Sequence, residues 1–541
     1  MTMLLLTAAE MRELDRATIE GGHATGEALM ERAGAGVAEA MERRYGPALA
    51  LRVVVLCGTG NNGGDGFVAA RHLRARGAET HVGLIGERER VRGDARLHLE
   101  RLEREGTGVT EIGTEEALQR FLATRARWDF ALDALLGTGS RGGLEGMIAA
   151  AAQALRDLDD AGTRVVAVDL PTGVHPDTGE IARRAVRADL TVTFGAPKRG
   201  QWLYPGRAFV GALEVVDIGL VPVTDPARYP VELATGLGIA DLLPARDPRA
   251  HKGSAGRVLI VGGSPGLTGA VTLAARGASR AGAGYVQCAV PEGLSDILAV
   301  KLTSEMTLPS PQTAGRTLAR AGLDRIRGWA ERAHAVLIGS GLSRDPESAG
   351  LARALVTGRT LPTVLDADGL NAYEGTEGFD SHSGAPLVLT PHLGEMERLT
   401  GDTPASLEAR RIDAAREWAA RWKAVVVLKG APTVTAAPDG RATVNPTGNP
   451  GLATAGTGDV LAGMIAALLA QRLDPYDAAR AAAYVHGLAG DRVAGEKGAL
   501  GLDSGDVAEA VPAAMHALTR ARDEALEKRS GNARGGAESS T

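Results

Sequence analysis

The sequence predicts an α/β protein with two units: an N-terminal doubly wound parallel sheet and a C-terminal α/β domain. Three observations support this fold class. Short apolar runs recur along the chain, stretches with helical periodicity separate them, and glycine-rich or polar segments follow them. Continuous apolar runs that alternate with helices are typical of parallel strands buried on both faces. In such sheets the loops that leave the carboxyl ends of the strands form the binding site.

Length and charge narrow the classes of function. With 541 residues, the chain is too long for one hydrophobic core. Its 44% hydrophobic and 23% charged residues are ordinary for globular protein. The net charge of -6, from 60 basic and 66 acidic residues, gives no sign of a nucleic-acid or membrane partner. We therefore expect neither partner.

The cysteines and the N-terminus predict a cytoplasmic protein. Cys57 and Cys288 are far apart in the sequence, and each sits in or beside an apolar run. Two buried thiols fit a reducing compartment better than a disulfide framework does. Residues 1–20 carry a short leucine cluster and then a charged helical pattern, which matches neither a signal peptide nor a membrane span.

Composition divides the chain into four segments. The first α/β unit is expected over residues 1–222, and a proline-rich linker over 223–250. The second unit is expected over 251–521. Residues 522–541 turn charged and then rich in glycine and serine, so we expect them to be disordered.

The first unit begins with two amphipathic helices, the first carrying Met11, Leu14, Ala17 and Thr18 on one face. A strand, a glycine-rich loop and a helix follow at residues 52–57, 58–66 and 67–76. Further strands are predicted at 128–136, 164–170 and 190–194.

The exits of these strands carry the candidate site. Glycines in the 58–66 loop permit close backbone approach, although an ordinary βα turn would look similar. Asp133 and Asp169 each end or nearly end a strand and could converge with Asn62 and Thr172; the amide, carboxylate and hydroxyl oxygens suit a hard cation, unless each acid only caps its loop. Lys198 could clamp a phosphate, donate a proton or sit in solvent.

In the second unit, each predicted strand is again followed by a polar segment. Strands are predicted at 257–261, 336–338, 363–365, 387–389 and 425–428. A glycine-rich turn ending at Asp459 then enters the apolar helix 460–469. Such a turn directs N–H groups and the positive end of the helix dipole at one point. With a carboxylate beside it, this arrangement suits phosphoryl transfer to an alcohol. A plain N-cap at Asp459 is the simpler alternative.

Together these motifs resemble one family, over about residues 5–515. The first half resembles the NAD(P)HX epimerase domain, through residues 29–34, 61–66, 133–139 and 168–173. The second half resembles the ADP-dependent NAD(P)HX dehydratase, through residues 390–395, 429–433 and 456–459. The resemblance implies a Rossmann-like fold for the first unit and a ribokinase-like fold for the second.

The resemblance also implies roles for particular residues. Asn62, Asp133 and Thr172 would hold potassium, and Asp459, Asp169 and Asp65 would be catalytic. The hydrated nucleotide in the epimerase would contact Asn61, Asn62, Gly63, Gly64, Asp65, Gly137, Thr138, Gly139, Ser140, Arg141, Gly142, Gly143 and Asp169. In the dehydratase it would contact Ala270, Gly341, His392 and Asp459. ADP would contact Lys429, Gly430, Ala431, Pro432, Thr433, Thr457 and Gly458. Thr172 stands where similar proteins often carry serine, and it keeps the hydroxyl.

The implied activity is repair of hydrated nicotinamide nucleotides. The first domain would interconvert R and S epimers of NADHX and NADPHX. The second would use ADP to phosphorylate the C6 hydroxyl, converting a poor leaving group into a good one, and would release AMP, phosphate and NAD(P)H. Magnesium would assist this step. The resemblance also implies a homo-oligomer, because ribokinase-like domains commonly assemble.

Three alternatives remain open at this point. The second half alone would fit a small-molecule kinase that leaves a stable phosphoester. The first half could be a binding or regulatory module without epimerase activity. A dinucleotide oxidoreductase is disfavoured, because no Gly-x-Gly-x-x-Gly with a following acid appears after Val55.

Overall fold

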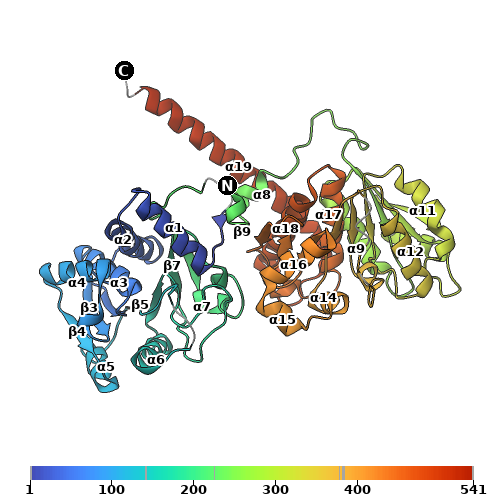
Figure 1. Cartoon of the computed structure of the whole chain (residues 1–541). Coiled ribbons are helices and arrows are strands. Elements are labelled where there is room, and N and C mark those ends of the chain that lie inside the picture. The colour runs from blue at the N-terminus through green and yellow to red at the C-terminus, as the bar shows by residue number, and fades with distance from the viewer. Residues whose placement is uncertain (1–2, 140–142, 224–225, 377, 380–383, 539–541) are drawn as a thin grey trace. The chain divides into compact units, whose positions relative to one another are not determined.

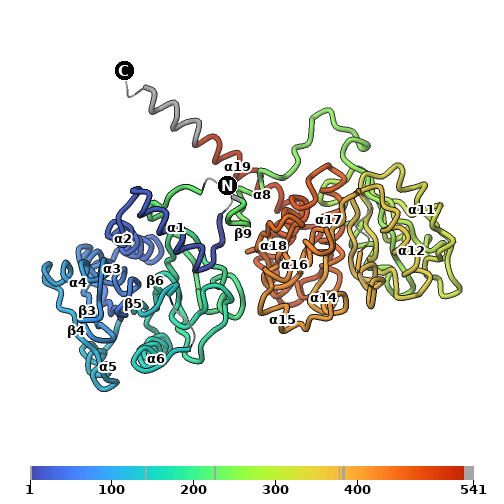
Figure 2. The backbone as a smooth tube through the Cα atoms, in the orientation of Figure 1, coloured from blue at the N-terminus to red at the C-terminus, as the bar shows by residue number. Residues whose placement is uncertain are grey.

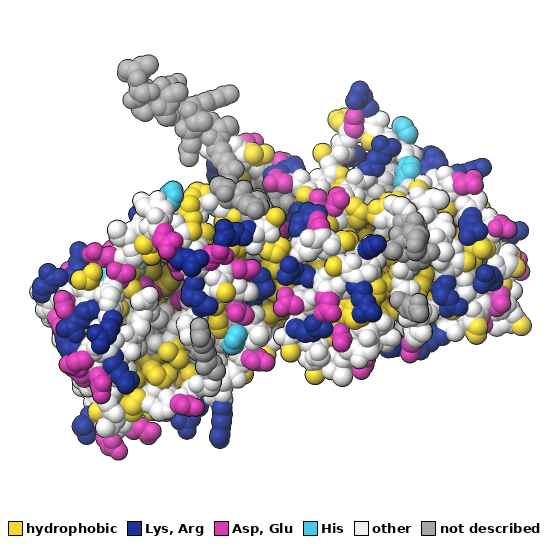
Figure 3. Space-filling view, viewed as in Figure 1, with side chains coloured by type: hydrophobic (Ala, Val, Ile, Leu, Met, Phe, Trp, Pro, Cys, Tyr) yellow, Lys and Arg dark blue, Asp and Glu magenta, His cyan; other side chains and the backbone are white. Residues whose placement is uncertain are grey.

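The computed structural model describes residues 3–139, 143–223, 226–376, 378–379 and 384–538 (Figure 1), and Figure 2 traces its backbone as a tube. The described residues form two compact units, one over residues 4–229 and one over Met3 with residues 230–538. Figure 3 shows basic and acidic side chains interspersed on the visible face of each unit. Among the described residues, no helix is both long enough and apolar enough to cross a membrane.

The first unit is built on a fully parallel sheet with the order β4-β3-β2-β5-β6-β7-β8. Its strands are β2 Arg52–Cys57, β3 Glu79–Ile85, β4 Val109–Ile112, β5 Phe130–Ala134, β6 Arg164–Val168, β7 Leu190–Phe194 and β8 Ala212–Val216. Its main helices are α1 Ala8–Glu20, α2 Gly26–Tyr45, α3 Asn61–Ala75, α4 Gly93–Arg104, α5 Glu115–Leu122, α6 Gly146–Asp160 and the short α7 Arg207–Val210.

Helices cover both faces of this sheet, as the doubly wound prediction requires (Figure 1). Along β2, Val53 and Val55 belong to a core with α2, α3 and α4. The alternating residues Val54 and Leu56 belong to a second core with α5 and α6. Both faces are therefore apolar, which is why β2 reads as a continuous hydrophobic run.

The second unit contains an eleven-stranded sheet with the order β1-β9-β18-β17-β16-β15-β14-β13-β10-β11-β12. Its strands are β1 Met3–Leu4, β9 Val231–Leu233, β10 Arg257–Val261, β11 Tyr285–Pro291, β12 Met306–Ser310, β13 Ala335–Ile338, β14 Thr363–Leu365, β15 Leu387–Leu389, β16 Val425–Leu428, β17 Val434–Ala436 and β18 Ala442–Val444. The pairings of β17 with β16 and β18 are antiparallel, and β10 to β16 pair in parallel.

Its helices are α8 Gly236–Ala240, α9 Thr268–Arg280, α10 Ser295–Lys301, α11 Leu323–Ala330, α12 Pro346–Thr357, α13 Asp368–Asn371, α14 Leu393–Thr400, α15 Pro404–Ala409, α16 Arg411–Trp422, α17 Thr457–Ala470, α18 Pro475–Lys497 and α19 Ser504–Glu538. Helix α17 is apolar on nearly all sides and packs closely on α9. A Cβ at Gly463 would lie 2.0 Å from the carbonyl oxygen of Ala274, so only glycine permits this approach. The close contact holds α17 firmly against α9.

Two expected segments differ from the structure. The proline-rich stretch 223–250 contains strand β9, which pairs in parallel with β18, and helix α8. Valine and leucine of β9 are buried, so a short apolar alternation outweighs the surrounding prolines. Helix α19 runs to Glu538, through most of the tail expected to be disordered, and residues 539–541 lie outside the description. Residues 520–528 are rich in good helix formers and include an Arg520–Glu524 ion pair.

Candidate active sites

The candidate site of the first unit lies where the strand order reverses. Strand β2 has β3 on one side and β5 on the other, so the connections after β2 and β5 leave on opposite faces. Between them opens the crevice in which sheets of this kind bind ligands. The predicted residues of the first unit follow β2, β5, β6 and β7.

The segment 61–66 was predicted as a loop, and this is wrong: α3 begins at Asn61. The glycines explain the difference. A Cβ at Gly63 would lie 1.9 Å from the carbonyl oxygen of Gly58, and one at Gly66 would lie 2.5 Å from the Ala134 Cβ. Glycine therefore lets the helix begin directly against the ends of β2 and β5. Gly63 and Gly64 are buried in this packing, whereas Asn61 is exposed.

Two of the predicted cation ligands, Asp133 and Thr172, contact each other after β5 and β6. Asp133 is fully buried; its two carboxylate oxygens each accept a bond of 2.7 Å, from the backbone N–H and the hydroxyl of Thr172. Burial raises the pKa of Asp133 to about 6, and the Thr172 bonds oppose that rise. The Asn62 amide oxygen lies 2.8 Å from the position a Cβ would take at Gly137, so glycine keeps the space beside it open.

The strongest electrostatic feature of this unit is a buried ion pair. Lys198, 1% exposed, places its Nζ 2.6 Å from Oδ1 of Asp169 and also donates to the Thr193 hydroxyl at 2.8 Å. Thr193 in turn donates to the same Asp169 oxygen at 3.0 Å. Asp169 has φ of +66°, a strained conformation for a residue with a side chain, and such strain is concentrated at functional sites. The sequence left the role of Lys198 open, and the structure excludes a solvent-exposed lysine.

Two further acids act on this ion pair. Burial raises the pKa of Asp65 well above its ordinary value; Asp169 and Asp15 add to the rise and Lys198 opposes it. Burial likewise raises the pKa of Asp15 to about 6, with Lys198 opposing and Asp169 adding. One ammonium and three carboxyl groups therefore form a single cluster.

The connection after β5 borders the cluster in part. A Cβ at Gly137 would lie 3.2 Å from Oδ2 of Asp169, so this glycine stands between Asn62 and Asp169. Thr138 is half-buried, and Gly139 and Gly143 are exposed. The predicted substrate contacts Ser140, Arg141 and Gly142 lie outside the described residues.

The second unit has a corresponding crevice between β10 and β13, whose connections also diverge. Ala270 follows β10, and Gly341 follows β13. A Cβ at Gly341 would lie 3.1 Å from the Ala270 Cβ, so these two predicted substrate residues are in contact range. Gly341 has φ of +63°, which glycine adopts without strain.

A half-buried lysine organises the charges of this site. The Nζ of Lys429 lies 3.0 Å from Oδ1 of Asp366 and 3.6 Å from Oε2 of Glu395. Burial disfavours the ammonium, but the two carboxylates hold the pKa of Lys429 above its ordinary value. A Cβ at Gly458 would lie 3.4 Å from the same Nζ, which places the lysine against the first turn of α17.

The start of α17 combines free donors with a carboxyl group. The N–H groups of Gly458 and Asp459 have no acceptor among the described residues, as expected for the first turn of a helix. Burial raises the pKa of Asp459 to about 7, and the charge of Asp366 adds to the rise while Lys429 opposes it. The hydroxyl of Thr457 instead bonds to the carbonyls of Leu452 and Thr454, so its side chain shapes the turn.

His392 and the 429–433 loop complete the predicted set. His392 caps α14: its Nδ1 accepts from the N–H groups of Gly394 and Glu395 at 3.0 and 3.2 Å. Its Nε2 lies 3.5 Å from Oε1 of Glu395, and the side chain is 54% exposed, so a ligand can reach the ring. Thr433 closes its loop by donating to the Gly430 carbonyl at 3.1 Å, while Ala431 is exposed and Pro432 is buried.

Sequence reasoning missed four contributors. Asp15 adds a charge to the Lys198 cluster, and Asp366 adds one beside Lys429; neither was predicted as a site residue. Glu395 was named only as part of the 390–395 motif. Arg411 is 2% exposed and donates to the carbonyls of Lys429 and Pro432 at 3.2 Å each, so it holds the 429–433 loop. Asp366 could have been found from its place directly after a strand. Arg411 offered no such signal, because an arginine on an amphipathic helix is expected to face solvent.

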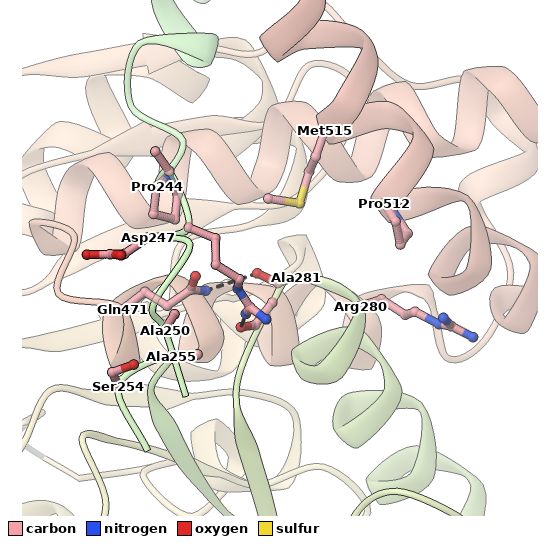
Figure 4. Close-up of a pocket in the computed structure, with 13 residues that line it drawn as sticks. Pro244, Asp247, Ala250, Ser254, Ala255, Arg280, Ala281, Gln471, Pro512 and Met515 are labelled. Carbon is pink, nitrogen blue, oxygen red and sulfur yellow. Dashed lines mark hydrogen bonds between the residues drawn. The ribbon is translucent and has the colours of Figure 1, made fainter. Parts of the chain in front are cut away.

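The described surface also contains cavities away from these sites. One of ≈ 440 Å³ is lined by Pro244, Arg280, Gln471 and Met515, among others (Figure 4). Gln471 follows the C-terminal end of α17, whereas Asp459 lies in its first turn. This cavity therefore belongs to the other edge of the sheet.

Comparisons with known proteins agree with the two-unit arrangement. The sequence model of a family described as NAD(P)H-hydrate dehydratase matches residues 258–513, and that of the YjeF-related protein N-terminus matches residues 26–200. A bifunctional NAD(P)H-hydrate repair enzyme from Moorella thermoacetica is 44% identical over 95% of this chain and 97% of its own length. One from Thermofilum pendens is 40% identical over 97% and 99%.

A solved structure was also matched. The crystal structure of an ADP/ATP-dependent NAD(P)H-hydrate dehydratase from Bacillus subtilis is 32% identical and covers 53% of this chain and 98% of its own, with a TM-score of 0.47.

Proposed function

Because the chain belongs to the family of bifunctional NAD(P)H-hydrate repair enzymes, we propose that the Lys198 cluster epimerises hydrated NAD(P)H and that the Asp459 site dehydrates it. The observation that carries the proposal is the start of α17. There a carboxyl group with a pKa of about 7 stands beside two free N–H groups and a half-buried lysine. A base beside an anion site is what phosphoryl transfer to an alcohol requires.

In the dehydratase, Asp459 takes the proton of the C6 hydroxyl as its oxygen attacks the β-phosphorus of ADP, and AMP leaves. The N–H groups of Gly458 and Asp459 stabilise the charge on the transferring phosphoryl group. Phosphate then leaves C6, driven by the ring nitrogen lone pair, and loss of a C5 proton restores the dihydropyridine. Lys429, Gly430 and Thr433 lie where the nucleotide phosphates would bind.

Magnesium fits this site through oxygen donors. Asp366 uses only Oδ1 for its bonds to Lys429 and Thr390 among the described residues, which leaves Oδ2 for a cation. Glu395 lies beside it as a second carboxylate. When bound with the nucleotide, the ion would neutralise phosphate charge.

In the epimerase, the C6 of the hydrate carries both the hydroxyl and the ring nitrogen, so it is a hemiaminal that can open reversibly. Asp169, paired with Lys198, takes the hydroxyl proton, and the carboxylic acid of Asp65 protonates N1 as the C6–N1 bond breaks. The resulting aldehyde recloses on its other face to give the other epimer. Burial raises the pKa of Asp65 well above its ordinary value, which suits it to the acid role, while the ion pair with Lys198 holds Asp169 for the base role.

Potassium fits the first unit through Asn62, Asp133 and Thr172. The three supply amide, carboxylate and hydroxyl oxygens, and the open space at Gly137 lies directly beside the amide oxygen. Among the described residues, no group of three or more His, Cys, Asp or Glu is arranged to hold a metal ion. The cation would supply positive charge near the nucleotide phosphates.

Product analysis tests the dehydratase assignment against a small-molecule kinase. We expect the purified chain, given S-NADHX, magnesium and ADP, to release one AMP and one free phosphate for each NADH formed. Phosphorus NMR distinguishes free phosphate from a phosphoester. A stable phosphorylated hydrate that accumulates without NADH would show a kinase instead.

A further inference from the structure

The N-terminal segment of the chain is attached to the piece of backbone that carries Lys198. The Leu6 N–H donates to the Pro197 carbonyl at 3.0 Å, and the Arg199 N–H donates to the Leu6 carbonyl at 3.0 Å. Leu6 and Lys198 thus form a parallel bridge. The family model that matches this unit begins only at residue 26, so this segment lies outside it.

Helix α1 is then held over the exits of three strands. Its capping box joins Thr7 and Glu10, and Glu10 also pairs with Arg199 after β7 at 3.1 Å. The Ala8 N–H donates to Asp177 after β6 at 2.6 Å. Arg12 reaches the Thr138 carbonyl after β5 at 3.5 Å. The helix therefore covers the edge of the sheet where Asp169 and Lys198 lie.

Asp15 is the acid that this placement directs inward. Met11 and Leu14 are buried residues of α1. Asp15 lies four residues after Met11, one helical turn further along the same face, and directly follows Leu14. Lys198 and Asp169 both act on its carboxyl group, and it acts on Asp65. An acid on the solvent face of a surface helix would do none of these.

We propose that Asp15 is a positioning residue of the epimerase, the third carboxyl group of the cluster built on Lys198. The inference rests on the proposed epimerase function. One ammonium neutralises one carboxylate, so with all three acids ionised a buried cluster would carry two uncompensated negative charges. A negative Asp15 therefore favours the protonated form of Asp65, the form that donates to N1.

Besides Asp15, other charged groups near Asp65 could shift its pKa. They are Asp169 after β6 and Lys198 after β7, and the Cys57 thiol of β2 lies in range of its charge. Burial holds the pKa of Cys57 far above neutrality, so the thiol stays uncharged. Of the two carboxylates, Asp169 is paired with Lys198, which leaves Asp15 as the adjustable charge.

The test uses the full chain, one purified NADHX epimer and no nucleotide, with epimer equilibration followed by chromatography across pH. We expect Asp15→Asn to slow equilibration on the alkaline side of the pH profile, by about tenfold for each unit by which the pKa of Asp65 falls, because above that pKa the protonated fraction changes tenfold per unit. The pH at which the rate declines on the alkaline side should move lower. Asp15→Glu should restore most of the rate. Glu20→Gln, an exposed change on the same helix, should match the wild type.

The readouts separate the possible failures. For each variant, the rate of S-NADHX dehydration with ADP and the thermal unfolding transition show whether the chain is correctly folded. An Asp15→Asn chain with the wild-type rate and pH profile, or one slowed with an unmoved alkaline decline, would overturn this inference alone. A wild-type chain that never equilibrates the epimers would overturn the proposed epimerase and the inference together.

Discussion

Asp459→Asn should lower dehydration of S-NADHX by about 100- to 10,000-fold, the usual contribution of a general base. The substitution removes the proton acceptor but keeps the side-chain volume and the N–H groups of the first turn of α17. The rate of NADH formation with saturating ADP measures the effect. Epimer equilibration by the same protein should stay at the wild-type rate, since the Lys198 cluster is in the other unit.

The wild-type dehydratase should also show a matching pH dependence. Burial and the neighbouring Asp366 raise the pKa of Asp459 to about 7. The base must be ionised, so kcat/KM should rise as pH increases through about 7 and then level off. An Asp459→Asn chain that keeps the wild-type rate, or a rate independent of pH between 5 and 9 (about two units either side of that pKa), would contradict the role of this carboxylate.

Asp169→Asn should abolish most epimerisation, again by about 100- to 10,000-fold. It removes the proposed base and leaves the buried Lys198 ammonium without its partner at 2.6 Å. Breaking a buried ion pair from one side costs about 3 kcal/mol or more, so the free energy of unfolding should fall as well. Equilibration of a single epimer and urea unfolding measure the two effects.

A matched control separates lost chemistry from lost stability. Asp189 caps the start of β6 by accepting from the Val165 N–H at 2.8 Å, and it has no place in the cluster. Asp189→Asn should therefore leave epimerisation unchanged. If Asp169→Asn equilibrates the epimers as fast as this control, Asp169 is not the base.

Much of the fold was predictable because buried parallel strands leave a simple signal. The strands 52–57, 190–194 and 257–261 have the predicted bounds. Their exits carry most of the candidate groups, because a parallel sheet gathers its carboxyl ends at one edge. Strands such as β3 and β4 went unpredicted, since they are partly exposed and mix polar residues with apolar ones.

What escaped prediction depends on tertiary contacts. The helix start at Asn61 requires glycine to approach Gly58 and Ala134, residues that no local pattern connects with it. Asp15 is one charged residue among several on an amphipathic helix, and only the Leu6–Lys198 bridge places it at the cluster. Asp366 and Glu395 became important through Lys429, which is 63 residues from Asp366 along the chain.

The central claim is that one chain repairs both epimers, with each step in its own unit. The most direct measurement is the absorbance of reduced nicotinamide after an R/S mixture of NADHX is added to the chain with potassium, magnesium and ADP. For the wild type, we predict complete recovery of NADH from both epimers. For Asp169→Asn, we predict that recovery stops once the S epimer in the mixture, the S share, is used up. Recovery that stops at the S share in the wild type would contradict the epimerase, and no recovery at all would contradict the repair function.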